Sequence, residues 1–447
     1  MKLEDVASQV IEAAQRNGAT AADVVAVEGD SLEVAVRLGE IDRLKQAHEK
    51  HLGLRVFVGE RSAVTSSADF SRQSLERLAA DSCELARVLA EDSFAGLPQP
   101  PPDAVGLPAM DLCDPEVAAV TAERAIAFAQ EAEAAARDVD ARITNSEGAH
   151  CHTSHGRRVY ASSAGFRAGY DSSSISLWAI PVAAENGSMQ RDHWFSANRK
   201  LAGLEAPADV GRKAAERALR RLNARQVRTC EVPVVFDQQT AASLLGHLAA
   251  AVSGDAVYKG LSFLAGKLGQ RIAPEIVTVV DDGRLDGGLA SKPFDGEGLP
   301  TRRNVIAERG GLVSYLCDSY TARKLGTAST GNASRSVGGV PHPAPTNFVL
   351  EPGTTSPQEI IGSVKSGFYV TELIGFGVNG TTGDYSRGAA GLWIEDGQLT
   401  FPVEQVTIAG NLMAMYDAIE VIGNDLDLRR TVAAPTLKIG RMTVAGN

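Results

Sequence analysis

The sequence has no long apolar run, few aromatic residues and only five cysteines among its 447 residues. No segment approaches the ~18 consecutive apolar residues that a membrane span requires, so no membrane association is expected. The opening MKLEDVASQV has acidic residues and helical periodicity in place of an apolar core, which argues against a secretory signal. The cysteines are scattered and odd in number, which is typical of a reducing cytoplasm and not of a disulfide framework.

Positive charge is also scarce. Lys and Arg number 44 against 55 Asp and Glu, which gives a formal net charge of −11. Binding to a nucleic-acid backbone needs a basic surface, so no nucleic-acid partner is expected. Glycine is abundant, with 44 residues, while aromatic residues make up 5%. This pairing favours a turn-rich β protein, and the length predicts two or three domains.

Residues 1–105 are predicted to form a helix, an antiparallel meander of short strands and a second helix. Gly29-Asp30, Gly39 and Gly59 separate apolar β runs and are predicted to be the turns of that meander. The Pro-rich stretch 97–108 cannot continue a helix, so it is predicted to end this first domain.

Two further domains are predicted. Residues 112–225 begin with an Ala/Glu-rich helix, expected from Pro115 to Val139, and continue with strands that pack with the first domain. The pair Asn186-Gly187 between two β runs is a strong hairpin signal. Residues 229–447 are mainly short strands and Gly-rich turns. The predicted fold class is α+β, with an N-terminal region of helices and antiparallel sheet and a strand-rich C-terminal domain with a partly closed sheet.

Residue types that bind metals cluster in the segment GAHCHTSHGR. On a strand, His150 and His152 would point to the same side, with Cys151 and His155 nearby, so a soft-metal site is conceivable. The favoured alternative is a polar hairpin tip between two strands, because no second element offers an evident further ligand. A third hypothesis is an autonomous hydrolase that uses another site, of which this segment is a candidate.

The segment from Gly375 to Gly380 matches the GxGxxG spacing of dinucleotide-binding loops. Such a loop needs a helix to begin there, so that the helix N-terminus can meet the pyrophosphate. The residues that follow, TTGDYSRGAAG, are poor helix material, so the dinucleotide interpretation is rejected. The glycines would instead let the backbone approach another chain or a peptide closely. Just beyond them, Asp384 and Arg387 could form a local ion pair.

The stretch EVPVVFDQQTAASLLGHLAAAVSG (231–254) predicts a buried strand, a polar cap at Asp237 and a helix that carries His247. A zinc peptidase helix presents two histidines on one face, with a glutamate beside the first to activate water. With the HExxH spacing ending at His247, these positions would be Ser243 and Leu244, and neither residue can serve. The residues alone favour a packing role for His247 over a zinc-binding role.

Over essentially its whole length the sequence resembles the TldD/PmbA (TldD/TldE) metallopeptidase family, and its PmbA (TldE) branch in particular. The order and spread of the matching segments make this resemblance specific. The segments are NSEGA (145–149), ASSAGF (161–166), GSMQRDHWFS (187–196), VVFDQQTAASLLGH (234–247), LSFLAGKLG (261–269), DDGRLDGGLAS (281–291), FDGEGLPTRRN (294–304), LCDSYTARKLG (316–326), TTGDYSRGAAG (381–391) and VTIAGNL (406–412).

The resemblance implies a cytoplasmic zinc metallopeptidase of two related subunits that degrades or processes unfolded peptides. The name modulator of DNA gyrase also attaches to the family. In its TldD subunit the helix carries HExxxH, and a cysteine ligand follows nearer the C-terminus. With His247 as the last histidine, the first histidine position is Ala242 and the glutamate position is Ser243, and no cysteine follows Cys317. The resemblance therefore implies a chain with no catalytic or metal-binding residues, in which Ala242, Ser243 and His247 mark a vacated zinc site.

By the same resemblance, the chain is expected to form a heterodimer with a TldD-like catalytic subunit, which would carry the zinc as cofactor. The chain would close the cavity over that zinc and guide extended peptides, which free strand edges can accept by strand addition. The alternative is a self-associating peptide-binding module without protease activity, and the isolated chain could form a homodimer. The candidate residues of the cavity wall are Gly375, Gly377, Asn379, Gly380, Asp384 and Arg387.

Overall fold

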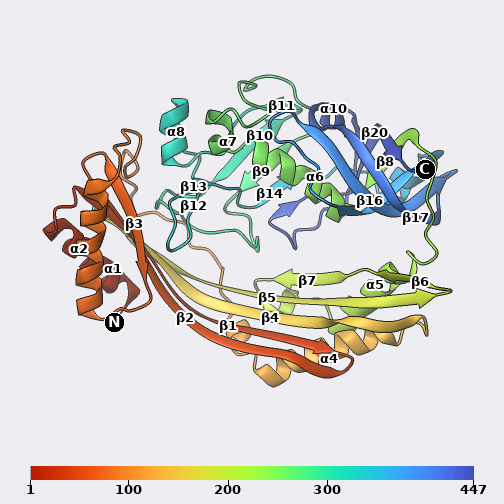
Figure 1. Cartoon of the computed structure of the whole chain (residues 1–447), viewed down its shortest axis with the longest axis horizontal. Helices are drawn as coiled ribbons and strands as arrows, with labels where there is room; N and C mark the ends of the chain where they lie inside the picture. Colours follow the sequence, from red (N-terminus) through yellow and green to blue (C-terminus); the bar gives the residue numbers. More distant parts are fainter. Residues whose placement is uncertain (1) are drawn as a thin grey trace.

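The computed structural model describes residues 2–447 and shows a long, curved sheet with a strand-rich C-terminal region on its concave side (Figure 1). Within these residues the sheet has seven strands, and all its pairings are antiparallel. The strands are β1 (Ala21–Arg37), β2 (Glu40–Val58), β3 (Arg61–Ser67), β4 (Ile143–Ser162), β5 (Arg167–Glu185), β6 (Ser188–Arg191) and β7 (Trp194–Asn198). Their order is β3-β2-β1-β4-β5-β6, and β7 also pairs with β5.

The strands of this sheet are longer than predicted, because the chain does not turn at Gly29-Asp30. β1 runs through both residues, and Gly29 lies opposite Gly156 of β4. A Cβ atom on Gly29 would come within 2.8 Å of the His155 carbonyl oxygen, so the glycine allows close approach of two strands. The turns predicted at Gly39 and Gly59 are confirmed, with φ values of 86° and 63°.

Helices cover the convex face of the sheet (Figure 1). They are α1 (Leu3–Arg16), α2 (Arg72–Val88), α3 (Pro115–Ala118), α4 (Ala122–Arg137) and α5 (Pro207–Leu219), with a 3-10 turn η1 (Leu201–Gly203). Even-numbered side chains of β1 face them: Val24 packs with α1 and α2, and Val34 packs with α4 and α5. None of the helices in residues 2–447 combines the length and the apolar composition needed to cross a membrane.

Two predictions for the middle of the chain have different outcomes. The single helix expected from Pro115 to Val139 is interrupted, because the Thr121 hydroxyl accepts a hydrogen bond from the Arg124 backbone N–H and starts α4. The hairpin predicted at Asn186-Gly187 is confirmed between β5 and β6, and both turn residues have positive φ, as a two-residue hairpin loop requires.

The C-terminal region combines a closed barrel of five strands with a second, five-stranded sheet, counted over the described residues. The elements are β8 (Cys230–Phe236), α6 (Gln238–Ala251), α7 (Gly254–Tyr258), β9 (Val279–Asp282), β10 (Arg303–Glu308), β11 (Gly311–Leu312), α8 (Ser319–Leu325), β12 (Ala333–Ser334), β13 (His342–Pro343), β14 (Phe348–Leu350), α9 (Pro357–Gly362), β15 (Ser366–Ile374), β16 (Asp384–Glu395), β17 (Gln398–Asn411), α10 (Leu412–Asp417), β18 (Ile419–Ile422), β19 (Val432–Ala433) and β20 (Leu437–Ala445).

The barrel order is β17-β16-β15-β8-β20, and pairing of β17 with β20 closes it. The second sheet has the order β11-β10-β9-β14-β19, and a short β12-β13 pair stands apart. Helix α6 is buried in the same core as both sheets, through Leu244, Leu245 and Leu248. The predicted α+β fold with a strand-rich C-terminal domain is confirmed, and the barrel sheet closes fully.

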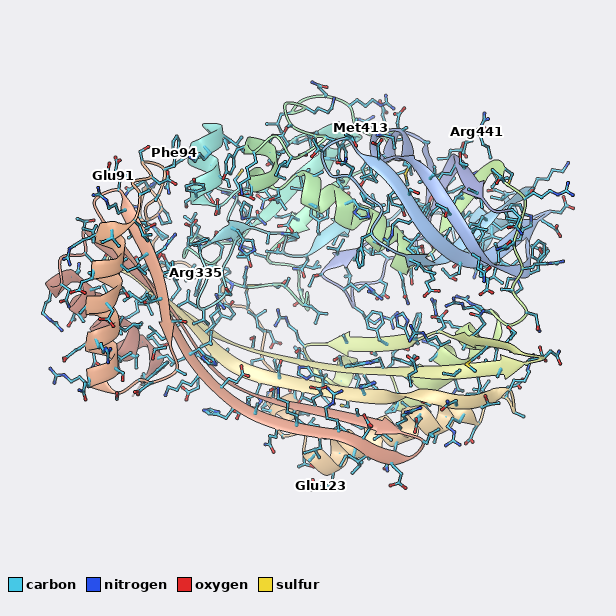
Figure 2. All side chains as sticks on the ribbon, viewed as in Figure 1. Glu91, Phe94, Glu123, Arg335, Met413 and Arg441 are labelled. Carbon is cyan, nitrogen blue, oxygen red and sulfur yellow. The ribbon has the colours of Figure 1, made fainter. Side chains whose placement is uncertain are left out.

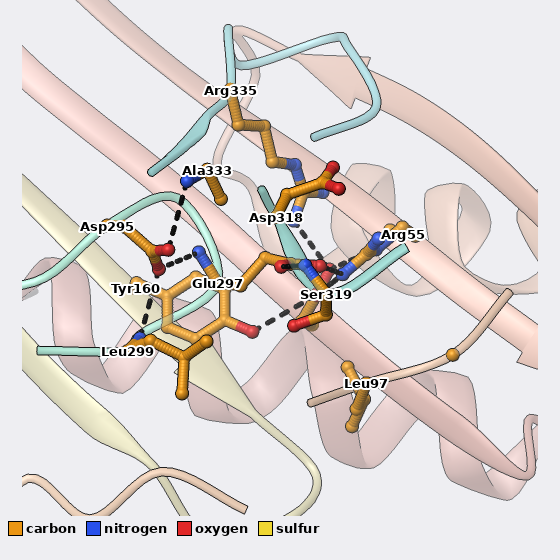
Figure 3. A network of polar contacts seen from close by, with 12 residues as sticks. Arg55, Leu97, Tyr160, Asp295, Glu297, Leu299, Asp318, Ser319, Ala333 and Arg335 are labelled. Atoms are coloured by element: carbon orange, nitrogen blue, oxygen red, sulfur yellow. Dashed lines mark hydrogen bonds and ion pairs between the residues drawn. The ribbon is translucent and has the colours of Figure 1, made fainter. Parts of the chain in front are cut away.

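A buried group of charges joins the concave face of the long sheet to the C-terminal region (Figures 2 and 3). Asp23 on β1 is fully buried and accepts hydrogen bonds from Arg55 on β2 at 3.1 Å and from Arg335 at 2.6 Å. Tyr160 on β4 donates a further hydrogen bond to Asp23, also at 3.1 Å. Burial alone would raise the pKa of Asp23, but the two guanidinium groups outweigh it and hold that pKa below its ordinary value.

Two further buried carboxylates extend this group of charges (Figure 3). Glu297 lies 3.7 Å from Arg55 and accepts a hydrogen bond from the Ser319 backbone N–H at 2.8 Å. Asp295 accepts hydrogen bonds from the backbone N–H groups of Glu297 and Ala333, at 2.9 and 3.0 Å. Burial and the nearby charge of Glu297 raise the pKa of Asp295 to about 7, and burial also raises the pKa of Glu297.

Replacing Asp23 with Asn should destabilise the protein by about 3–5 kcal/mol, because two buried guanidinium groups then lose their compensating charge. The free energy of unfolding, from urea titrations followed by tryptophan fluorescence, measures this loss. Glu33→Gln is the matched control, since Glu33 lies on the same strand but pairs with Arg43 at the surface. Loss of a surface pair costs only about 0–1 kcal/mol. Similar losses in the two variants would contradict the importance of the Asp23 contacts.

Stability should fall as the pH rises from about 4 to about 7, because Asp295 binds its proton more tightly in the folded than in the unfolded chain. Its contribution is fully present below the unfolded pKa and is lost as the pH rises through the higher folded pKa. The free energy of unfolding should drop by up to about 1.4 kcal/mol per pH unit in this window.

Urea titrations across this pH range test the assignment. The slope should shrink in Asp295→Asn and persist in Asp81→Asn, whose carboxylate is exposed on α2. A full slope in the Asp295 variant would assign the pH dependence to other groups.

Candidate functional site

The strand and helix predicted at 231–254 are confirmed as β8 and α6, joined at Asp237. The buried Asp237 carboxylate accepts hydrogen bonds from the Thr240 backbone N–H and hydroxyl, both at 2.9 Å, which fixes the start of the helix. Arg217 of α5 lies 3.6 Å from this carboxylate. Burial nevertheless raises the pKa of Asp237. The cap holds α6 at the end of a central barrel strand.

The C-terminal half of α6 borders a cavity of about 330 Å³. His247 lines this cavity together with Gly375, Gly380 and Arg387, so the structure brings together four of the residues singled out from the sequence. The remaining lining is almost entirely apolar: Ala250, Ala251, Ala256, Leu261, Phe263, Phe376, Val378 and Leu412.

Arg387 on β16 supplies the positive charge of this cavity. It donates a hydrogen bond to the Ser243 hydroxyl at 3.0 Å and a second to the Leu373 carbonyl oxygen at 3.3 Å. Its Nε atom is buried and has no hydrogen-bond partner within residues 2–447. The guanidinium group therefore contacts Ser243, one of the three positions predicted to mark a vacated zinc site.

Two neutral groups lie beside this guanidinium. The rings of His247 and Tyr385 pack edge to face, with centroids 5.9 Å apart. His247 Nε2 and the Tyr385 hydroxyl are buried and, like Arg387 Nε, lack a hydrogen-bond partner in the described part of the chain. Burial, and then the charge of Arg387, lowers the pKa of His247, so its imidazole is neutral at pH 7. Burial raises the pKa of Tyr385 to about 12, so its phenol keeps its proton.

The residues at this site do not fit a zinc ion. Zinc in proteins is held by several His, Cys, Asp or Glu side chains, and His247 is the one such residue that lines the cavity. Ala242 is 6% exposed and has no donor atom, while the Ser243 hydroxyl already accepts from Arg387. No group of three or more such side chains in residues 2–447 is arranged to hold a metal. The positive charge of Arg387 would also repel a divalent cation.

Two of the predicted wall residues shape the loop that joins β15 to β16. A Cβ atom on Gly377 would come within 2.0 Å of the Ser386 carbonyl oxygen, so this glycine allows contact within its own chain. The Asn379 side-chain oxygen accepts a hydrogen bond from the Thr381 backbone N–H at 2.9 Å and stabilises a turn. The loop connects antiparallel strands and no helix starts in it, as the rejection of a dinucleotide site requires.

Asp384 and Arg387 do not form the local ion pair that their spacing in the sequence allows. Three residues apart on a strand, they point to opposite faces of β16. Asp384 accepts a hydrogen bond from the Thr382 hydroxyl at 2.7 Å, away from the cavity. Tyr385, which the sequence reasoning missed, shares the face of Arg387. Side chains alternate between the two faces of a strand. A strand predicted to begin after Gly383 would therefore have placed Tyr385 on the same face as Arg387.

The His/Cys segment 150–155 lies in the middle of β4, paired with β1 on one side and β5 on the other, so the hairpin-tip interpretation is wrong. His150 stacks on Trp178 with ring centroids 4.8 Å apart, while Cys151 is buried in the core on the helix-covered face. His155 lies 3.4 Å from Asp30. Among the described residues, these side chains do not converge on a metal-binding arrangement.

Comparisons with known proteins place this chain in one family. Models of the PmbA/TldA metallopeptidase domain 1, central domain and C-terminal domain match residues 22–86, 115–222 and 229–446. The chain is 37% identical to Metalloprotease PmbA of Escherichia coli O157:H7 over 444 residues, which cover 99% of this chain and 96% of the relative. It is 28% identical over 281 residues to a Metalloprotease TldD homolog of Buchnera aphidicola subsp. Acyrthosiphon pisum, 58% of each chain.

A solved structure has the same fold. The protein, described as a modulator of DNA gyrase from Bacteroides thetaiotaomicron, superposes with a TM-score of 0.92 at 28% identity, with 99% of both chains covered. Sequence, domain order and fold therefore agree along the whole chain, which belongs to the PmbA/TldD metallopeptidase family.

Proposed function

We propose that the chain is the non-catalytic subunit of a heteromeric TldD/TldE-type zinc metallopeptidase that degrades or processes unfolded peptides. The observation that carries this proposal is the composition of the family's zinc site on α6. Ala242 and Ser243 stand at the first histidine and glutamate positions, and the Arg387 guanidinium is hydrogen-bonded to Ser243. A site built in this way binds neither a zinc ion nor an activated water.

The catalytic zinc would therefore lie on a related chain with the HExxxH helix. The similarity of this chain both to Metalloprotease PmbA and to a Metalloprotease TldD homolog supports that pairing, because it places chains of both kinds in one family. The two chains would then divide the work, with the chemistry on the TldD-like subunit and substrate handling shared between them.

Substrate handling by this chain would use its strand edges and the cavity beside α6. In the described residues, β3 and β7 each pair on one side only, with β2 and β5 respectively. An unfolded peptide can add to such an edge through main-chain hydrogen bonds, largely independently of its sequence. A β-rich subunit without its own metal site is suited to this role.

Zinc content and activity, measured with and without a TldD-like partner, test the proposal. The isolated chain should contain far less than one zinc per molecule by mass spectrometry and should not cleave unfolded casein. Mixing with the partner should give a complex on gel filtration that contains zinc and cleaves casein. The zinc content of this complex should be unchanged by His247→Ala, because the metal lies on the other chain.

Two outcomes would overturn the proposal. One is stoichiometric zinc in the isolated chain, with casein cleavage that His247→Ala abolishes. The other is separate elution of the two chains at micromolar concentration, with self-assembly of this chain alone, which would favour a peptide-binding module without protease activity.

A further inference from the structure

We propose that the cavity beside α6 is a carboxylate-binding subsite that receives the C-terminal residue of a peptide, with Arg387 as its anchor. The inference rests on the proposed function in one respect, namely that peptides are what this chain handles. It goes further by naming the part of the peptide that is held and the side chains that hold it.

The first observation is the group of unpartnered polar atoms. Arg387 Nε, His247 Nε2 and the Tyr385 hydroxyl are all buried and all lack a hydrogen-bond partner within residues 2–447. Buried polar atoms in folded proteins are nearly always hydrogen-bonded, and each one left unsatisfied costs about 1–3 kcal/mol. Arg387 and His247 line the cavity, Tyr385 packs against His247, and all three groups can donate a hydrogen bond. The component that the cavity lacks is therefore an acceptor.

The second observation is the charge. Both hydrogen bonds of Arg387 go to neutral oxygens, the Ser243 hydroxyl and the Leu373 carbonyl. A partly buried guanidinium is best stabilised by a carboxylate, which matches its planar set of donors and forms strong charge-assisted hydrogen bonds. The neutral His247, which also lines the cavity, adds a donor without adding charge. The site is therefore complementary to one negative charge.

The third observation is the shape and chemistry of the walls. A volume of about 330 Å³ is at the small end of ligand pockets, and Leu261, Phe263 and Val378 make the walls apolar. Phe376, on the rim, is 99% exposed and can contact the residue that precedes the bound one. A carboxylate next to an apolar side chain describes the last residue of a peptide, whereas an inorganic anion would leave the apolar walls unused.

Binding measured on the full chain without any partner tests the subsite. The probe is acetyl-Ala-Ala-Phe with a free carboxylate, titrated calorimetrically, and its expected Kd is on the order of 0.1–1 mM for a ligand of this size. Two comparison peptides identify the group recognised: the C-terminal amide of the same peptide, and acetyl-Ala-Glu-Phe amide, in which the carboxylate is on a side chain. The free acid should bind at least about tenfold more tightly than either amide.

Two substitutions locate the binding. Arg387→Gln should weaken binding of the free acid about tenfold or more and abolish its preference over the amide. Arg441→Gln is the matched control, because Arg441 projects from the outer side of β20, 75% exposed, and pairs with Glu231 (Figure 2); its binding should be unchanged. Ala250→Trp fills the cavity from an exposed helix position without touching the guanidinium contacts, and it should also abolish binding.

Equal binding of the acid and its amide would overturn the proposal, as would tighter binding of the Glu-containing amide or full binding by a folded Ala250→Trp chain. Failure here is distinguishable from failure of the proposed function. This binding involves neither zinc nor the partner, whereas the subunit role is judged by zinc content and complex formation.

Discussion

The arrangement of the whole chain depends on one buried carboxylate, Asp23, which must remain paired. It lies between Arg55 on the neighbouring strand and Arg335, 312 residues further along the chain. An isolated buried charge costs several kcal/mol. The C-terminal region covers Asp23 and also supplies Arg335 as its second partner, so the charge stays paired where it is buried. The backbones also touch there, since a Cβ atom on Gly53 would come within 1.5 Å of the Val337 carbonyl oxygen. Charge pairing and close contact together fix the C-terminal region relative to the long sheet.

The site on α6 also depends on a buried charge that needs partners, but there the charge is positive. A zinc peptidase surrounds a divalent cation with ligands that donate lone pairs. In this chain the cation is the guanidinium of Arg387, which needs acceptors and offers donors, and its neighbours Ser243, His247 and Tyr385 are all neutral. Such a site cannot lower the pKa of a water, but it attracts an anion.

Local features were predictable from the sequence, because they depend on periodicity and turn chemistry within short segments. The strand and helix at 231–254 and the Asn186-Gly187 hairpin are of this kind. The turn predicted at Gly29 is wrong. In a sequence, a glycine that lies close to a neighbouring strand cannot be told apart from a glycine in a loop. The family resemblance predicted the positions of a vacated zinc site, but the contact of Arg387 with Ser243 joins residues 144 apart. Neither composition nor spacing encodes such a contact, and the pairing of Asp23 with Arg335 was hidden for the same reason.

The presence of His247 is therefore better explained by its neighbours than by the metal that the family's helix suggests. A histidine that served packing alone would have both faces in apolar contact and its ring nitrogens bonded or exposed. His247 Nε2 is instead buried without a partner, next to two other donors in the same condition. One unsatisfied group can be absorbed as local strain, but three around a single charge add up to several kcal/mol. Arg387 and His247 both line the cavity, where an acceptor from outside the chain would meet them, whereas the apolar side chains of the wall offer none.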